Sequence, residues 1–400
     1  MKAPTITIAA VALAMRAAVA YPGIKDTIDQ INSRAAASPP NASPELIGDL
    51  EHLSESSLTP TGSAIKRILL GQLNPQDLVS TYTPPPRDSS ACAADTCCIW
   101  KYIAEDLHAA MVGTAGRCNK LARGAVRLGF HDAGGWSRST GPGGGADGSI
   151  LLANECEERR ENGGLLPICA QMRTWWASYK PYGISLADLV QFAAAVGAVA
   201  CPQGPRVRSF VGRRDSAAPA PRGNLPSPFA SADALLRLFA DKTLGARDLV
   251  ALLGAHTASR QITVDRNRTG APQDTTPGVW DAAFFRETAA ATAPAQVVRF
   301  PSDTNLAADP RTAGWFGVYG RALGPAQALW NDDYARAYVR LSLLGVANVN
   351  DLTECTHALP PATGPGFASP DAEQMARFAR GELAGAAVDA ALEEGDLLPQ

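Results

Sequence analysis

At residues 127–132 the chain reads RLGFHD, within a segment, 121–133, whose apolar residues recur every three or four positions. That spacing predicts an α-helix, on which Arg127 and His131 share one face because they are four residues apart. A guanidinium and an imidazole directed at one point can perform acid–base chemistry: His131 moves a proton and Arg127 stabilises negative charge. The alternative is an ordinary charged helix face with a chance histidine.

Shortly downstream, residues 143–149 read GGGADGS. Glycines allow sharp turns that direct carbonyl groups inward, and Asp147 and Ser149 add hard oxygen donors. Together with Asp132 they predict a Ca²⁺ site. A flexible glycine-rich linker would explain the glycines but not the acidic and hydroxyl residues.

A second histidine follows the apolar run LVALLGAHT, residues 249–257. Leu249, Leu252 and His256 share one helical face, so the histidine is expected to face an apolar interior. Most such histidines are hydrogen-bonded core residues. The other interpretation is an axial ligand of haem iron, held by a carboxylate for which Asp303 is the candidate.

Residues 274–281, DTTPGVWD, place two carboxylates and a hydroxyl in one tight loop. With Thr257 this loop could bind a second Ca²⁺. Asp, Thr and Pro also favour turns and helix caps, which is the alternative.

The composition excludes some classes of partner. The 400 residues are 46% hydrophobic and 19% charged, with a formal net charge of −3. Without a basic bias there is no reason to expect nucleic acid as a partner. Beyond the N-terminus no stretch approaches the roughly 18 apolar residues of a membrane span, so no membrane partner is expected.

The N-terminus and the cysteines indicate export. Residues 1–20 combine a lysine, an apolar run and the ending AVA, which predicts a signal peptide, although Arg16 interrupts the run and a buried helix is the alternative. Eight cysteines and the sequons at Asn41 and Asn267 agree with an extracellular location.

Helical periodicity dominates the remaining pattern, which predicts a mainly α fold with few short strands, residues 207–211 being the candidate strand. The helical segments are 100–112, 121–133, 185–199, 231–242, 246–256 and 331–344. The predicted organisation is a signal peptide at 1–20, an N-terminal extension or pro-segment at 21–90, a cysteine-bounded domain at 91–358 and a C-terminal tail at 359–400.

Taken together, these motifs resemble those of the haem peroxidases, in particular the secreted fungal class II group that includes lignin and manganese peroxidases. The resemblance extends from about Cys97 to Cys355 and includes, in family order, RxxFHDA, GGADGSI, CPxGP, GRxD, LLGAHT and DxTPxxxD. It implies two helical lobes, about 91–220 (distal) and 221–358 (proximal), with one haem b between them and two Ca²⁺ ions. Such a protein would act as an extracellular monomer.

The resemblance assigns roles to the matching residues. His131 is the distal acid–base, Arg127 the charge stabiliser and Asn162 the partner of His131. The cofactor-binding residues are His256 as iron ligand, Asp303, Phe130 and, at the substrate entrance, Pro226. The distal calcium ligands are Asp132, Gly145, Asp147 and Ser149, and the proximal ones are Thr257, Asp274, Thr276, Val279 and Asp281. The glutamate expected to support Asn162 is left open among Glu157, Glu158 and Glu161.

The implied reaction is reduction of hydrogen peroxide followed by two one-electron oxidations of a donor. The three acids that bind Mn²⁺ in manganese peroxidases fall at Lys120, Gly124 and Ile262, and the surface tryptophan of lignin peroxidases falls at Ala251. We therefore expect small phenolic or aromatic donors and a low-potential enzyme, with roles in lignin or aromatic degradation or in peroxide removal. Whether Trp136, Trp175 or Trp176 relays electrons is left open.

Two other positions depart from the family. Gln273 stands where a proximal phenylalanine is usual, and Gly314 where a disulfide cysteine is common. The resemblance implies the pairs Cys118–Cys201 and Cys97–Cys355. The pairing of the other four cysteines is left open, with Cys156–Cys169 and Cys92–Cys98 as the expected combination.

Two hypotheses of other classes compete. A secreted, calcium-stabilised haem-binding protein with little catalysis would not need the intact pair of Arg127 and His131. A hydrolase or zinc enzyme using His131 and Asp132 would need a nucleophile elbow or an HExxH helix, and the sequence has neither.

Overall fold

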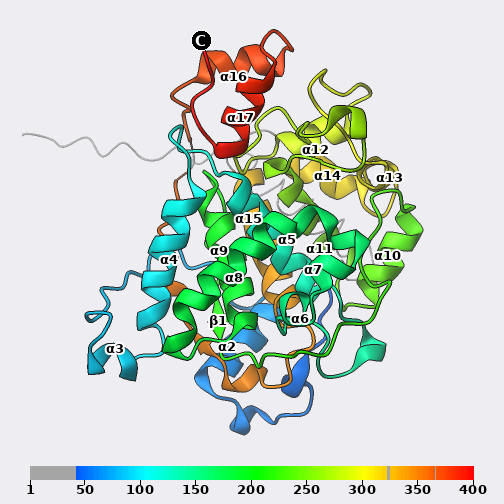
Figure 1. Ribbon diagram of the computed structural model, residues 1–400. Helices are drawn as coiled ribbons and strands as arrows, with labels where there is room; N and C mark the ends of the chain where they lie inside the picture. Colours follow the sequence, from blue (N-terminus) through cyan, green and yellow to red (C-terminus); the bar gives the residue numbers. More distant parts are fainter. Residues whose placement is uncertain (1–41, 322–324, 365) are drawn as a thin grey trace, which may run out of the picture. The chain divides into compact units, whose positions relative to one another are not determined.

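The computed structural model describes residues 42–321, 325–364 and 366–400 (Figure 1). The predicted signal peptide at 1–20 and the first part of the predicted extension lie outside the described residues.

The described part of the chain is mainly helical, which confirms the predicted fold class. Its helices are α2 Pro60–Leu69, α3 Ser90–Ala94, α4 Cys98–Met111, α5 Lys120–Ala133, α6 Ser149–Leu152, α7 Glu155–Glu158, α8 Leu166–Tyr179, α9 Leu186–Ala200, α10 Ala232–Ala240, α11 Ala246–Leu253, α12 Ala283–Ala289, α13 Pro301–Ala308, α14 Ala313–Tyr319, α15 Pro325–Leu341, α16 Ala372–Ala379 and α17 Ala386–Glu394. Short 3₁₀ turns lie between them, and two carry site residues: Arg160–Leu165 and Gly254–Ala258.

Strand structure is limited to one small antiparallel pair. Strand β1 (Phe210–Val211) pairs with β2 (Thr353–Glu354), with Phe210 opposite Glu354. The strand predicted at 207–211 is therefore shorter than expected, and Val207 instead forms an isolated bridge with Gln76.

Helix α9 is the central helix of the core, because all of its residues are buried. It contacts both α4 and α5, and α5 is its most extensive partner (Figure 1). The two backbones approach closely at Gly129, where an added Cβ would lie 2.7 Å from the Cβ of Ala194. This contact holds the helix that carries Arg127 and His131 rigidly against the core.

Two predicted helices differ most from the expected ends, and the other four differ by one or two residues. The segment 246–256 is α-helical only to Leu253, after which a 3₁₀ turn carries His256. The segment 331–344 overlaps α15, which begins earlier, at Pro325, and ends at Leu341. Helix α8 was not predicted, because its apolar residues do not concentrate on one face.

The N-terminal and C-terminal segments both carry helices with buried side chains. In α2, Ile65 and Ile68 have no exposed surface. In the tail, Phe378 of α16 and Leu392 of α17 belong to a second, smaller apolar cluster. The domain boundaries at residues 91 and 358 stay predictions.

All eight cysteines form disulfides. The two pairs implied by the family resemblance, Cys118–Cys201 and Cys97–Cys355, are confirmed. The other four cysteines pair as Cys156–Cys169 and Cys92–Cys98, the expected combination.

Within the residues that the structure describes, no single helix is long and apolar enough to cross a membrane. One bent pair, Arg160–Tyr182 with Leu186–Ala200, passes that test of length and composition only when its two parts are taken together.

Candidate active site

The distal side of the site is built on α5. Asn119 caps the helix by accepting hydrogen bonds from the backbone N–H groups of Leu121 and Ala122. The helix then runs unbroken to Ala133, so Arg127 and His131 lie one turn apart as predicted. Phe130 stacks with Phe239 of α10, with 6.3 Å between the ring centroids.

The hydrogen bonds of His131 define its tautomer. Its Nδ1 lies 2.8 Å from Oδ1 of Asn162, which can only accept, so Nδ1 carries the proton. Nε2 therefore has a free lone pair, and in this structure it accepts a hydrogen bond of 3.2 Å from Nε of Arg127. The imidazole is thus set up as a base at the atom that faces Arg127.

Electrostatics keep that base neutral. Burial, reinforced by the positive charge of Arg127 and opposed by the hydrogen bond to Asn162, lowers the pKa of His131 to about 3. Burial also lowers the pKa of Arg127, although its side chain is accessible to solvent. The lowered pKa and the solvent access are compatible because the guanidinium is surrounded by protein groups but borders a space that solvent can enter.

Asn162 is held from the side away from His131. It is 1% exposed, and its Nδ2 donates to the main-chain carbonyl of Glu155 at 3.0 Å. This support was expected from the side chain of Glu157, Glu158 or Glu161. It comes instead from the backbone of Glu155, a residue that the sequence did not point to. The disulfide Cys156–Cys169 closes the loop that contains Asn162.

The proximal side is built on the 3₁₀ turn after α11. His256 Nδ1 lies 2.9 Å from Oδ2 of Asp303, a fully buried carboxylate in the first turn of α13. The rings of Phe284 and Phe300 pack against the imidazole at 5.6 and 5.5 Å between centroids. No hydrogen bond in the described part of the chain engages Nε2 of His256.

This donor set fits a haem iron. A neutral imidazole with one nitrogen held by a carboxylate and the other free is the usual form of a metal-ligating histidine. The side chain of His256 is 31% exposed, so the free nitrogen is accessible.

The predicted distal calcium ligands lie together at the end of α5 and in the segment that follows it. Backbone N–H groups of Gly148 and Ile150 donate to Asp132, and that of Ser149 donates to Asp147. Burial and the charge of Asp147 raise the pKa of Asp132 well above its ordinary value. Ser149 Oγ is buried without a hydrogen-bond partner. Two buried acids and an unpartnered hydroxyl fit a Ca²⁺ ion, which would satisfy all three.

The predicted proximal calcium ligands also combine two carboxylates with hydroxyl and carbonyl oxygens. Thr257 Oγ1 donates to Asp274 at 2.5 Å and approaches the carbonyl oxygen of Val279 at 3.4 Å. The backbone N–H of Thr276 donates to Asp274 at 2.9 Å. Burial and the neighbouring Asp281 raise the pKa of Asp274 well above its usual range. A cation between the two carboxylates would remove that repulsion.

Neither set contains more than two carboxylates, and the described residues contain no cluster of three or more His, Cys, Asp or Glu side chains suited to a metal. The calcium assignments therefore depend on hydroxyl and carbonyl oxygens, including that of Gly145, and stay predictions.

Pro226 lies half-buried in the loop before α10. Its neighbour Leu225 packs near the end of α5, where a Cβ on Gly134 would be 3.0 Å from it. The loop is therefore beside the distal helix, and the role of Pro226 at a substrate entrance stays a prediction.

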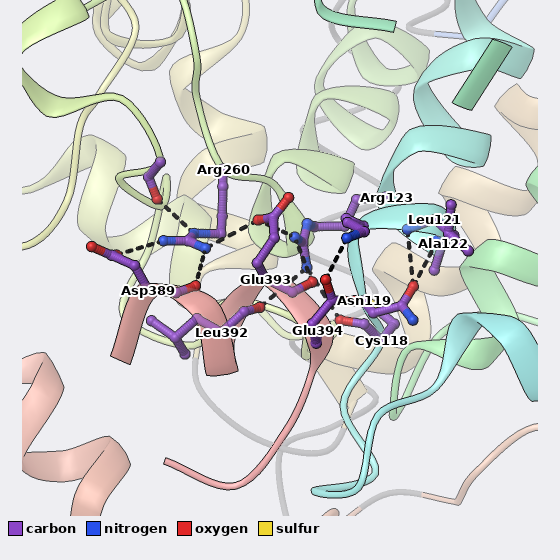
Figure 2. A network of polar contacts seen from close by, with 12 residues as sticks. Cys118, Asn119, Leu121, Ala122, Arg123, Arg260, Asp389, Leu392, Glu393 and Glu394 are labelled. Carbon is purple, nitrogen blue, oxygen red and sulfur yellow. Dashed lines mark hydrogen bonds and ion pairs between the residues drawn. The ribbon is translucent and has the colours of Figure 1, made fainter. Parts of the chain in front are cut away.

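The C-terminal tail contacts the first turn of α5 (Figure 2). Lys120 pairs with Glu394. Arg123 pairs with Glu393 at 2.7 Å. Arg260, just after the proximal turn, also contacts Glu393, at 3.0 Å. These pairs join residues more than a hundred positions apart, and sequence analysis did not foresee them.

Comparisons with known proteins identify the family. The profile of the family described as "Peroxidase" matches residues 104–322. "Ligninase C" of Trametes versicolor is 33% identical over 310 residues, which cover 70% of this chain and 81% of the relative. "Manganese peroxidase 3" of Phlebia radiata is 33% identical over 300 residues, or 69% and 80% of the two chains. "Peroxidase" of Arthromyces ramosus is 32% identical over 288 residues, or 66% and 76%.

The family match and the helical fold define a haem peroxidase, an oxidoreductase that acts on hydrogen peroxide. The chain belongs to the peroxidase family.

Proposed function

We propose that the chain reduces hydrogen peroxide with His131 as acid–base and Arg127 as charge stabiliser, while His256 holds the haem iron. The observation that carries this proposal is that each histidine has its Nδ1 held by a hydrogen bond, to an amide oxygen in His131 and to a carboxylate in His256. The hydrogen bond to Asn162 leaves the lone pair of His131 Nε2, which here accepts from Arg127, to act as a base. The hydrogen bond to Asp303 leaves Nε2 of His256 free to bind iron. Haem, when bound, would supply the iron at which the O–O bond of the peroxide is cleaved and the two electrons that this cleavage consumes.

The steps performed by the protein follow from these positions. With haem bound, Nε2 of His131 would accept a proton from one oxygen of hydrogen peroxide and deliver it to the other oxygen, which leaves as water. Arg127, whose Nε reaches the same nitrogen, stabilises the negative charge on the leaving oxygen. Asp303 accepts the Nδ1–H of His256 and so makes the imidazole a stronger electron donor. Two donor molecules would then each replace one of the two electrons consumed in reducing the peroxide.

A matched pair of variants tests the distal assignment. We expect His131→Ala to slow the reaction of the haem-loaded protein with hydrogen peroxide by about 10²–10⁴-fold, the usual contribution of a positioned acid–base. His108 on α4 has no role in the site, so His108→Ala should react at the wild-type rate. Equal rates for wild type and His131→Ala would disprove the role of His131.

The electron donor is proposed to be a small phenol or similar aromatic molecule rather than Mn²⁺. At the three positions where manganese peroxidases have acids, Lys120 is paired with Glu394 and Ile262 is 47% exposed. At the third, a Cβ on Gly124 would lie 2.9 Å from Ile168, so an acidic side chain would not fit without displacing it. Oxidation of Mn²⁺ at rates comparable with phenols would contradict this proposal.

Two Ca²⁺ ions and export complete the proposal. The unpartnered Ser149 Oγ supports the distal calcium site, and the mutual repulsion of Asp274 and Asp281 supports the proximal one. Four disulfides are consistent with an oxidising, extracellular compartment. We expect the secreted protein to be monomeric, without nucleic-acid or membrane partners.

A further inference from the structure

Gln273, the residue at the position where the family resemblance leads one to expect phenylalanine, lies within hydrogen-bond distance of the carboxylate that holds the proximal histidine. Its Nε2 is 3.1 Å from Oδ2 of Asp303 and 3.3 Å from Nδ1 of His256. The side chain is 2% exposed. A polar amide is therefore buried beside the iron ligand.

The chemistry of the neighbours determines which way the amide points. Asp303 has only acceptors when ionised, so the group facing it must be the NH₂ of Gln273 and not its carbonyl. At the other end, the carbonyl Oε1 accepts a hydrogen bond from the hydroxyl of Ser259. Both ends of the amide are thus occupied, and its orientation is fixed.

Two donors consequently converge on one oxygen. Oδ2 of Asp303 accepts from Nδ1 of His256 at 2.9 Å and from Nε2 of Gln273 at 3.1 Å. The other oxygen, Oδ1, accepts from Ser302 at 3.0 Å. Because Nδ1 of His256 is itself the donor to Asp303, Gln273 acts on the histidine through the carboxylate and not directly.

We propose that Gln273 is a positioning residue that weakens the hold of Asp303 on His256 and so raises the ferric–ferrous potential of the haem. A carboxylate that shares its charge with a second donor withdraws the Nδ1 proton less strongly. The imidazole then has less anionic character and stabilises the ferric state less. The proposal rests on His256 being the iron ligand, and the effect is defined against the same chain with an apolar residue at 273.

The test replaces Gln273 with methionine, which has nearly the same length but no donor. In the haem-loaded protein, Gln273→Met should lower the ferric–ferrous midpoint potential by ~59 mV. For a one-electron couple this corresponds to a tenfold change in the equilibrium constant for reduction of the iron. It should also raise the iron–histidine stretching frequency in the resonance Raman spectrum of the ferrous protein. A change confined to packing would lower the free energy of unfolding, but it would not lower the midpoint potential and raise the iron–histidine stretching frequency together.

Ser259→Ala provides a second test if Gln273→Met fails to fold or to bind haem. It removes the hydrogen bond that orients the amide but leaves Gln273 in place, so we expect shifts of the same sign and smaller size. Unchanged potential and stretching frequency in either folded variant would overturn the inference about Gln273. Absence of the iron–histidine band in the wild-type protein would instead overturn the assignment of His256.

Discussion

The C-terminal tail offers a prediction whose size follows from the contacts in Figure 2. Oε2 of Glu393 accepts from Nη2 of Arg123 at 2.7 Å and from Nη1 of Arg260 at 3.0 Å. The two arginine side chains are only 8% and 5% exposed, whereas that of Glu393 is 41% exposed. One partly exposed carboxylate therefore contacts two nearly buried guanidinium groups, and that of Arg260 also pairs with Asp389.

Glu393→Gln should destabilise the folded protein. Burial lowers the pKa of Arg123 to about 10, the charge of Glu393 opposes that shift, and Arg260 adds to it. Removing one partner of a fully buried pair costs about 3–5 kcal/mol. Because Glu393 is partly exposed and Arg260 keeps its contact with Asp389 at 2.7 Å, we expect a loss of about 1–2 kcal/mol.

The assay is urea unfolding of the calcium-loaded protein, combined with limited proteolysis of the tail. Glu373 on α16 is an exposed carboxylate, and Glu373→Gln serves as the matched control with a change of at most about 0.5 kcal/mol. Glu393→Gln should also be cleaved faster after α15 than the control. Equal stability and equal cleavage of the two variants would show that the tail is not held by these ion pairs.

Three further predictions concern the active site and its supports. Because the pKa of His131 is lowered to about 3, the imidazole stays neutral in mildly acidic solution. The rate of the peroxide step, measured by stopped flow, should therefore stay constant down to about pH 4. A fall in rate near the ordinary histidine pKa of about 6.5 would contradict this. The same depressed pKa means that the stability contributed by neutral His131 is present above about pH 6.5 and is lost as the pH falls towards 3. Elemental analysis should find two Ca²⁺ ions per chain, falling to one in Asp147→Asn and, separately, to one in Asp281→Asn, and an unchanged count in either variant would refute the corresponding site. Replacing both Cys156 and Cys169 with alanine should lower the free energy of unfolding by about 2–4 kcal/mol, measured by thermal or urea unfolding. It should also slow the peroxide step, because the bridge closes the loop that contains Asn162. Loss of stability at a wild-type peroxide rate would show that the loop holds Asn162 without the bridge.

The distal half of the site was predictable because its signal is local. Arg127 and His131 are four residues apart on a helix whose period is visible in the sequence, so their shared face follows from helix geometry alone. The pairing of His256 with Asp303 came instead from the family motifs, since nothing in the spacing of two residues 47 positions apart requires contact.

Other features depend on contacts that the sequence does not display. Helix α11 ends early where Gly254 packs against Trp330 of α15, at a point where an added Cβ would be 2.5 Å from the indole. Trp330 Nε1 also donates to the carbonyl of Ala251 at 2.9 Å. The support of Asn162 comes from a backbone carbonyl, which any residue type could supply. A pattern of side chains cannot reveal such a partner.

The most direct test of the central claim is the visible absorption spectrum of the purified, haem- and calcium-loaded protein before and after one equivalent of hydrogen peroxide, and again after addition of a phenol. If His256 holds the iron and His131 acts on the peroxide, the Soret band of a ferric high-spin haem will change on addition of peroxide and return when the phenol is added. A protein that fails to bind haem would contradict the assignment of His256. A haem spectrum that peroxide leaves unchanged would contradict the catalytic role of His131 and Arg127.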